Sequence, residues 1–233
     1  MTTISDNLQQ VHHRIERACA LAQRPVTEVT LLAVSKTFNR EAVRAALAAG
    51  QRAFGENYVQ EGLDKIAALA DRRGELEWHL IGPLQSNKTR VVAEAFDWVQ
   101  SVDRLKIAER LSAQRPAHLP PLNVCLQVNI SGEASKSGVA PAEASALAHA
   151  VAALPRLRLR GLMAIPEPEG ELDAQRAAHR ALRALYDALR AEGLALDTLS
   201  AGMSADLEAA VMEGSTMVRV GTAIFGLRPR ASI

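Results

Sequence analysis

Short apolar segments alternate with amphipathic segments along almost the whole chain, and this alternation limits the folds that the chain can adopt. Eight apolar segments have the length and composition of strands, and the segments between them have the spacing of helices. The predicted strands span residues 29–35, 52–57, 76–82, 97–102, 121–130, 157–165, 196–202 and 216–226. Strands that alternate with helices pair in parallel through right-handed crossovers. We therefore expect an α/β fold, a (β/α)8 TIM barrel.

The segments between the predicted strands support this expectation. Apolar residues recur at steps of three and four from Ile4 to Leu21, so a helix precedes the first strand and ends before Pro25. The later helices are expected at residues 40–50, 58–74, 86–95, 103–114, 140–154, 171–193 and 204–214. An open doubly wound sheet is the alternative, but the glycine-rich turn GxGxxG is missing after the first strand. Since no linker interrupts the pattern, we expect a single domain over residues 1–233.

Composition argues against several classes of function. The net charge of +1 gives no reason to expect nucleic acid or an anionic membrane as a partner. The two cysteines, Cys19 and Cys125, lie outside any CxxC pattern, which argues against a disulfide framework and a zinc site. The N-terminus lacks the apolar core of a signal peptide, and no apolar run is long enough to span a membrane. We expect a cytoplasmic protein.

The end of the first predicted strand is the first candidate for a functional site. Residues 31–34 are all apolar and lead directly into Ser35 and Lys36. In a barrel of this type the chemistry lies at the carboxyl ends of the strands. A lysine there points either into solvent or into the mouth of the barrel. In the second case a desolvated amine has a lowered pKa and acts as a nucleophile that forms Schiff bases with carbonyl compounds.

The loops after the last two predicted strands are candidates for binding a phosphate group. This is where barrels of this type usually bind phosphate. Gly202 and Ser204 stand just before a predicted helix, and Gly221 and Thr222 offer an exposed backbone and a hydroxyl group. The alternative is purely structural, with Ser204 as a helix cap and Gly221 in a tight bend.

A lysine and a phosphate site in one barrel mouth would fit either of two kinds of ligand, and Arg219 distinguishes between them. These are a sugar phosphate, as in an aldolase, and pyridoxal 5'-phosphate (PLP). Arg219 lies two residues before Gly221, so both face the same side of the strand. A guanidinium group inside a barrel needs a specific acceptor, and the pyridine nitrogen of PLP is one. An ion pair with a carboxylate such as Glu56 is the alternative.

The sequence resembles the YggS/PROSC family of pyridoxal phosphate homeostasis proteins. The resemblance is spread in order over residues 31–226. It rests on the segments LLAVSKT, FGENYVQE, WHLIGPLQSNK, QVNISGEASKSG, GLMAI and LSAGMSADLEAAVMEGSTMVRVGTAIFG. It implies a barrel like the N-terminal domain of alanine racemase, without the second domain of that enzyme.

The resemblance also assigns roles around the cofactor. Lys36 would hold PLP as a Schiff base, Arg219 would face its pyridine nitrogen, and Ser204, Gly221 and Thr222 would bind its phosphate.

Further positions would complete the site. Ser200 and Met203 would line the phosphate loop, Asn57 would lie beside the cofactor, and His79 would lie below it. Lys136 is a candidate second acceptor for PLP.

The resemblance favours a carrier over an enzyme, because the family is regarded as having no established activity. Phe38 departs from the family, since many members carry a polar or basic residue there, and this argues against transfer of PLP between lysines near Lys36. Racemisation needs a base on each face of the substrate, and in alanine racemase the second base is a tyrosine from the missing domain. The tyrosines of this chain are Tyr58 and Tyr186.

We therefore expect a protein of PLP homeostasis that buffers the cofactor or delivers it to PLP-dependent apo-enzymes, with weak racemase activity as the alternative. An uncovered barrel would leave PLP open to water and favour its release. The same exposed barrel suggests a monomer.

Overall fold

The computed structural model describes residues 2–132, 137–166 and 171–227 of the chain. Eight parallel strands form a closed barrel in chain order, and the last strand pairs with the first. The strands are β1 (Thr30–Val34), β2 (Ala53–Glu56), β3 (Glu77–Leu80), β4 (Trp98–Val102), β5 (Leu122–Gln127), β6 (Leu157–Met163), β7 (Thr198–Ser200) and β8 (Met217–Val220). The predicted barrel is confirmed.

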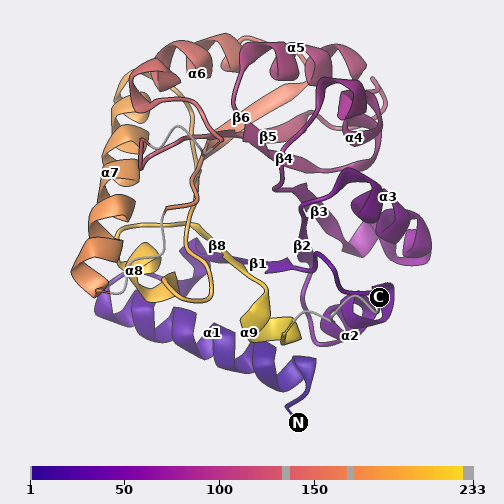
Figure 1. Cartoon of the computed structure of the whole chain (residues 1–233), viewed down its shortest axis with the longest axis vertical. Coiled ribbons are helices and arrows are strands. Elements are labelled where there is room, and N and C mark those ends of the chain that lie inside the picture. The colour runs from indigo at the N-terminus through magenta and orange to yellow at the C-terminus, as the bar shows by residue number, and fades with distance from the viewer. Residues whose placement is uncertain (1, 133–136, 167–170, 228–233) are drawn as a thin grey trace.

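Helices surround this barrel in a ring (Figure 1). The α-helices are α1 (Ile4–Leu21), α2 (Arg40–Ala48), α3 (Val59–Ala68), α4 (Thr89–Ala95), α5 (Leu105–Gln114), α6 (Ala144–Ala152), α7 (Leu172–Ala191), α8 (Leu207–Met212) and α9 (Thr222–Phe225). Short 3-10 turns also occur, namely η1 (Val26–Glu28), η2 (Ala70–Glu75), η3 (Ser86–Lys88) and η4 (Pro141–Glu143). None of the helices in the described ranges is both long and apolar enough to cross a membrane.

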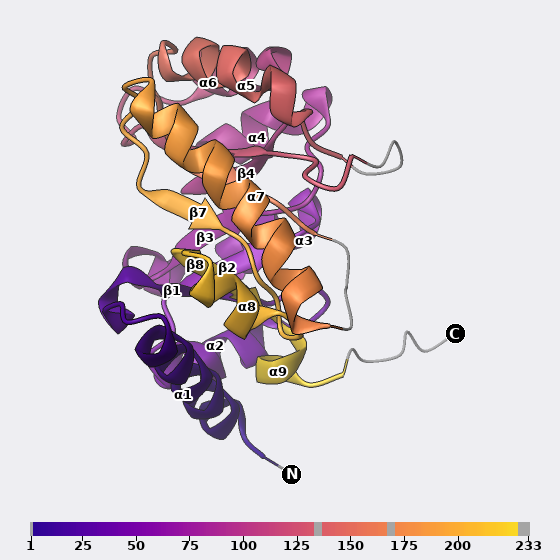
Figure 2. The same cartoon turned by 90° about the vertical axis from the view of Figure 1, so that its left-hand side faces the viewer.

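Helix α1 covers the outside of the barrel where β8 meets β1 (Figures 1 and 2). The helix begins with a capping box, in which the side chains of Thr3 and Asp6 bond to each other's backbone amides. Leu8, Val11 and Ile15 form its buried stripe, and it contacts α2, α8 and α9. The predicted N-terminal helix is therefore confirmed, and it closes the core over the last and first strands.

Two sequence predictions were wrong near the end of the chain. The last strand was predicted to reach residue 226, but β8 ends at Val220 and residues 222–225 form α9. The helix predicted from Ser204 begins at Leu207, after a turn. The apolar run after Gly221 misled the prediction because a short apolar run fits a buried helix as well as a strand. Ile224 of that run is fully buried.

The barrel interior is separate from the larger core between the strands and the helices. Alternate strand residues point inward and form two small apolar clusters, which are Leu32, Val34, Ala53, Ile81 and Met217, and Trp98, Cys125 and Met163. Polar side chains are also enclosed by the strands, among them His79, Gln100, Ser200 and Arg219. A polar group buried in this way needs a partner.

Candidate functional site

A cavity of about 280 Å³ opens at the carboxyl ends of the strands. Seven of the predicted site residues line it, namely Lys36, Asn57, Met203, Ser204, Arg219, Gly221 and Thr222. Val34, Ile81, Ile165 and Ala205 complete the lining. The other two predicted residues, His79 and Ser200, are fully buried inside the barrel and do not line this cavity.

Lys36 lies two residues after Val34, the last residue of β1, and is half-buried at the rim of the cavity. The residues on both sides of Lys36 are held by hydrogen bonds to carboxylates on the outer side of the barrel. The Ser35 hydroxyl donates to Glu56 Oε1 at 2.5 Å. The Thr37 amide donates to Glu61 Oε1 at 2.6 Å, and Thr37 has a φ of 68°. A β-branched residue rarely adopts a positive φ, so this turn depends on its anchors.

One buried amine joins these anchors. Lys65 Nζ donates to the Ser35 carbonyl at 2.7 Å, to Glu56 Oε1 at 2.8 Å and to Glu61 Oε1 at 2.7 Å. Burial raises the pKa of Glu56, while Lys65 and Ser35 oppose that shift. We call Ser35, Glu56, Glu61 and Lys65 the Lys65 latch. It ties the ends of β1 and β2 to α3, and therefore fixes the backbone from which Lys36 and Asn57 extend.

Arg219 points into the cavity from β8 and is held by carbonyl groups. Its Nη1 donates to the carbonyl and the hydroxyl of Ser200 at 2.8 and 2.9 Å, and its Nη2 donates to the Ala164 carbonyl at 2.8 Å. Burial lowers the pKa of Arg219 to about 10, so the group stays charged at neutral pH. Glu56, the alternative partner considered from the sequence, pairs with Lys65 instead.

The loop of residues 202–206 forms another wall of the cavity and is fixed from three directions. Asp206 Oδ1 accepts from the Met203 amide at 2.7 Å, and Asp206 Oδ2 lies 2.9 Å from His179 Nε2 on α7. Arg14 of α1 donates to the Ser204 carbonyl at 2.9 Å. On the neighbouring wall, a Cβ at Gly221 would lie only 3.1 Å from the Val34 carbonyl oxygen. The backbone at residue 221 therefore packs closely against the end of β1.

The charges around the cavity suit an anion. Among the described residues, the charged side chains that line it are Lys36 and Arg219, and no carboxylate faces it. The described part of the chain also contains no cluster of His, Cys, Asp and Glu that could hold a metal ion. A small anionic molecule with a group that reacts with an amine fits these features.

Comparison with known proteins places the chain among its relatives. Residues 7–229 match the family described as alanine racemase, N-terminal domain. The pyridoxal phosphate homeostasis protein of Pseudomonas aeruginosa is 64% identical over 228 residues, which cover 98% of this chain and 97% of the relative. That of Escherichia coli K12 is 57% identical over 229 residues, 98% of each chain. The chain belongs to the pyridoxal phosphate homeostasis protein family.

Solved structures agree with this family and with its fold. PipY of Synechococcus elongatus, a structure described as having PLP bound, is 40% identical with a TM-score of 0.79, covering 91% of this chain and all of that one. An alanine racemase of Clostridium difficile has a TM-score of 0.74 at 15% identity, covering 98% of this chain and 58% of the racemase. The second likeness concerns the fold, and it confirms the predicted resemblance to the racemase barrel.

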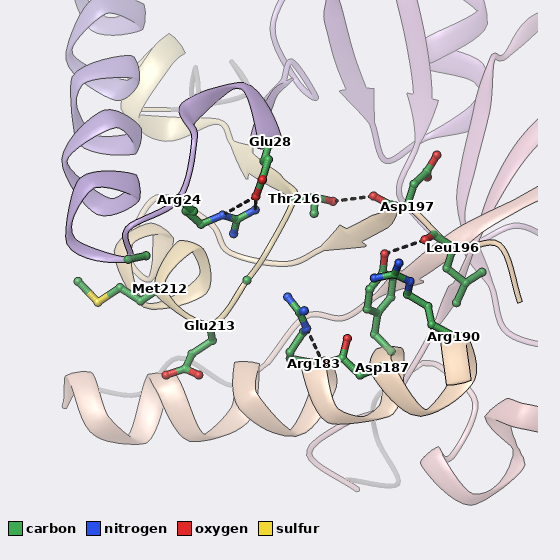
Figure 3. A pocket seen from close by; sticks show the side chains of 13 residues that line it. Arg24, Glu28, Arg183, Asp187, Arg190, Leu196, Asp197, Met212, Glu213 and Thr216 are labelled. Carbon is green, nitrogen blue, oxygen red and sulfur yellow. Dashed lines mark hydrogen bonds and ion pairs between the residues drawn. The ribbon is translucent and has the colours of Figure 1, made fainter. Parts of the chain in front are cut away.

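A larger cavity, of about 780 Å³, lies at the opposite end of the barrel, where β7 and β8 begin (Figure 3). It mixes guanidinium groups with carboxylates that pair with one another, such as Arg24 with Glu28 and Arg183 with Asp187. In barrels of this type that end contributes to stability rather than to chemistry. The smaller cavity is therefore the candidate functional site.

Sequence reasoning missed the residues that support the site from behind. Glu61 and Lys65 are four residues apart on α3, which was a readable pairing signal, but nothing in the sequence connected them to Lys36. Asp206 and His179 come from different helices and gave no local signal. Lys136, the candidate second acceptor, lies outside the described residues.

Replacing Asp206 with asparagine should weaken PLP binding about tenfold, which is the loss of one charge-assisted hydrogen bond. Burial opposes ionisation of Asp206, but the bonds from His179 and the Met203 amide outweigh it and lower the pKa of Asp206. Its stabilising contribution is therefore complete above the ordinary pKa of a carboxyl group and is lost only as the pH falls through the lowered value. An absorbance titration with PLP at neutral pH measures the effect. Unchanged affinity would mean that the loop does not depend on this carboxylate.

Proposed function

We propose that this protein binds pyridoxal 5'-phosphate through a Schiff base to Lys36 and acts in PLP homeostasis, as a buffer or a source of the cofactor. The observation that carries the proposal is the cavity in which an amine and a buried guanidinium face small and hydroxyl-bearing residues with no lining carboxylate in the described chain. PLP has a matching set of groups, namely an aldehyde, a pyridine nitrogen and a phosphate. The names of the relatives and the PLP-bound PipY structure support it.

Five of the lining residues have a role in this proposal. Lys36 provides the amine, and the Lys65 latch holds its backbone in place. Ser204, Gly221 and Thr222 receive the phosphate with hydroxyl and amide donors. When bound, PLP supplies an aldehyde and an electron-withdrawing ring. Arg219 is a donor that keeps its proton, so it leaves the ring nitrogen unprotonated and weakens that withdrawal.

The positions of the tyrosines favour a carrier over a racemase. Tyr58 directly precedes α3, has 61% of its surface exposed and does not line the cavity. Tyr186 lines the larger cavity at the opposite end of the barrel, where its hydroxyl donates to the Leu196 carbonyl. The described lining of the site offers no histidine, carboxylate or tyrosine as a second base. Racemisation requires one on the face opposite Lys36.

The proposal also covers the domain, the oligomeric state, the compartment and the recipients of the cofactor. The protein acts as a single domain of residues 1–233, as a monomer, in the cytoplasm, and PLP-dependent apo-enzymes receive the cofactor. Cys19 and Cys125 are free and buried, and this agrees with a reducing compartment. Phe38 supports the absence of a relay between neighbouring lysines, because its ring packs against Phe225 with centroids 5.1 Å apart.

Lys36→Ala should abolish covalent PLP binding. The wild-type protein is expected to show the visible absorption band of a lysine Schiff base, and borohydride reduction should fix a pyridoxyl group on Lys36 that peptide mass spectrometry locates. Lys106→Ala, at an exposed lysine of α5, is the matched control and should leave the band unchanged. A wild-type protein that stays colourless with added PLP would overturn the proposal. Formation of D-amino acids from L-isomers would favour the racemase instead.

A further inference from the structure

A continuous series of hydrogen bonds runs through the barrel from its far mouth to Arg219. Glu77 Oε1 lies 2.9 Å from His79 Nε2, and His79 Nδ1 lies 2.9 Å from Gln100 Nε2. The Ser200 hydroxyl then lies 2.6 Å from Gln100 Oε1 and 2.9 Å from Arg219 Nη1. We call Glu77, His79, Gln100 and Ser200 the interior chain. Its members come from β3, β4 and β7, so the closed barrel alone brings them together.

Every donor in this series points the same way. Arg219 can only donate, so the Ser200 oxygen accepts from it and the Ser200 proton goes to Gln100 Oε1. The Gln100 amide then donates to His79 Nδ1, which leaves the His79 proton on Nε2, facing the Glu77 carboxylate. The series therefore has a cation at one end and an anion at the other. Aligned hydrogen bonds of this kind polarise and strengthen one another in a medium of low dielectric constant.

The environment of the interior chain keeps this arrangement rigid. His79, Gln100 and Ser200 are fully buried, whereas the Glu77 side chain is 47% exposed at the far mouth. Burial lowers the pKa of His79, so the imidazole is neutral and has one donor and one acceptor nitrogen. Its ring stacks on Trp98 with centroids 4.9 Å apart.

Arg219 depends on this chain for its orientation. Ser200 accepts two hydrogen bonds from Nη1, through its carbonyl and its hydroxyl, while Nη2 bonds to a single carbonyl. If the hydroxyl group lost its acceptor on Gln100, it could turn and compete with Arg219 for other acceptors. The guanidinium would keep its two bonds to backbone carbonyls but lose its third partner, so the direction in which it presents its remaining N–H groups to the cavity would be less restricted.

We propose that the interior chain is a positioning device that sets the orientation of Arg219 toward the ligand from the opposite mouth of the barrel. His79, Gln100 and Glu77 act through Ser200 and touch neither the cavity nor its contents. The proposal rests on the proposed function for the identity of the ligand, but the hydrogen-bonded order exists in the protein without ligand and can be tested there.

The first test uses the ligand-free protein labelled with ¹⁵N histidine. His79 should appear as the neutral tautomer with its proton on Nε2, and a His79→Phe spectrum assigns the signal. Ser200→Ala should shift both ring nitrogens of His79, because Gln100 loses the donor to its oxygen. Ser112→Ala is the control, since Ser112 is a buried serine of α5 whose hydroxyl bonds to the Pro155 carbonyl, away from the interior chain. If the His79 signals do not shift in Ser200→Ala, or if they show a proton on Nδ1, the proposed order of hydrogen bonds is wrong.

The second test uses PLP and the members of the chain that lie far from the cavity. His79→Phe keeps the ring that stacks on Trp98 and removes both nitrogens. It should raise the dissociation constant of PLP about tenfold, which is the size of effect seen when the outer hydrogen-bond partners of metal-binding residues are removed. It should also shift the visible absorption band of the PLP-loaded protein. Glu77→Gln, at a half-exposed site, should change the affinity about threefold in the same direction. Ser112→Ala should change neither quantity.

The outcomes separate the two proposals. Wild-type protein that binds no PLP contradicts the proposed function, while the histidine spectra still decide the order of the interior chain. If PLP binds and folded His79→Phe and Glu77→Gln variants keep wild-type affinity and an unshifted band, Arg219 does not need the chain, and the positioning role is wrong.

Discussion

Replacing Lys65 with methionine is expected to lower the free energy of unfolding by about 3–5 kcal/mol, the usual result of removing one partner from a buried ion pair. Glu56 is fully buried, and its Oε2 has no hydrogen-bond partner in the described structure. Without Lys65, Glu56 Oε1 would keep only the Ser35 hydroxyl. Urea unfolding followed by circular dichroism measures the change.

A double variant tests whether the unpaired, buried carboxylate of Glu56 causes the loss of stability. Glu56→Gln in the Lys65→Met background removes the charge and should recover at least half of the loss. Arg44→Met is the exposed control, since Arg44 and Asp71 form a salt bridge at the surface, and it should cost less than about 1 kcal/mol. Equal losses in Lys65→Met and Arg44→Met would contradict the idea that the Lys65 latch is a buried network.

The loss in Lys65→Met should also depend on pH in a definite direction. Burial already raises the pKa of Glu56, and removing the Lys65 charge raises it further. The folded variant then binds a proton that the unfolded chain has released, so its stability falls as the pH rises through the raised folded pKa. The deficit relative to wild type should therefore be smaller in acid and grow toward neutral pH.

The barrel could be predicted because its signal is repeated along the chain. Each strand is a short apolar run and each helix has its own periodicity, so an error in one element leaves the order intact. Lys36 and Arg219 were predictable for a related reason, since the barrel places the ends of β1 and β8 at one mouth, whatever their separation in sequence. Local pattern and topology together were sufficient there.

The supports of the site could not be predicted, because they depend on three-dimensional packing. His79 was expected below the cofactor, but its partner Gln100 comes from β4, the Ser200 hydroxyl that bonds to Gln100 comes from β7, and no spacing in the sequence connects these strands. Glu56 alternates with residues that face the barrel interior, and only the structure shows that it points outward to Lys65 on α3. Such contacts carry no periodic signal.

Gly202→Ala is expected to lower the free energy of unfolding by about 2–5 kcal/mol and to weaken PLP binding. Gly202 has a φ of 94°, which costs about 1–2 kcal/mol for a residue with a side chain. A Cβ there would also lie 2.5 Å from the Cβ of Ala210 on α8, and relief of that overlap costs about 1–3 kcal/mol. The displaced residues would be Met203 and Ser204, which line the cavity directly after Gly202.

The two causes can be separated by a second substitution on α8. Ala210→Gly alone should cost about 1 kcal/mol, the difference in helix propensity. In the double variant it removes the overlap but leaves the positive φ, so the combined loss should be smaller than the sum of the single losses by at least about 1 kcal/mol. PLP affinity should recover with it, because the loop can return to its place. Additive losses would assign the whole effect to backbone strain at Gly202, and would mean that α8 tolerates the added methyl group by shifting away from the barrel.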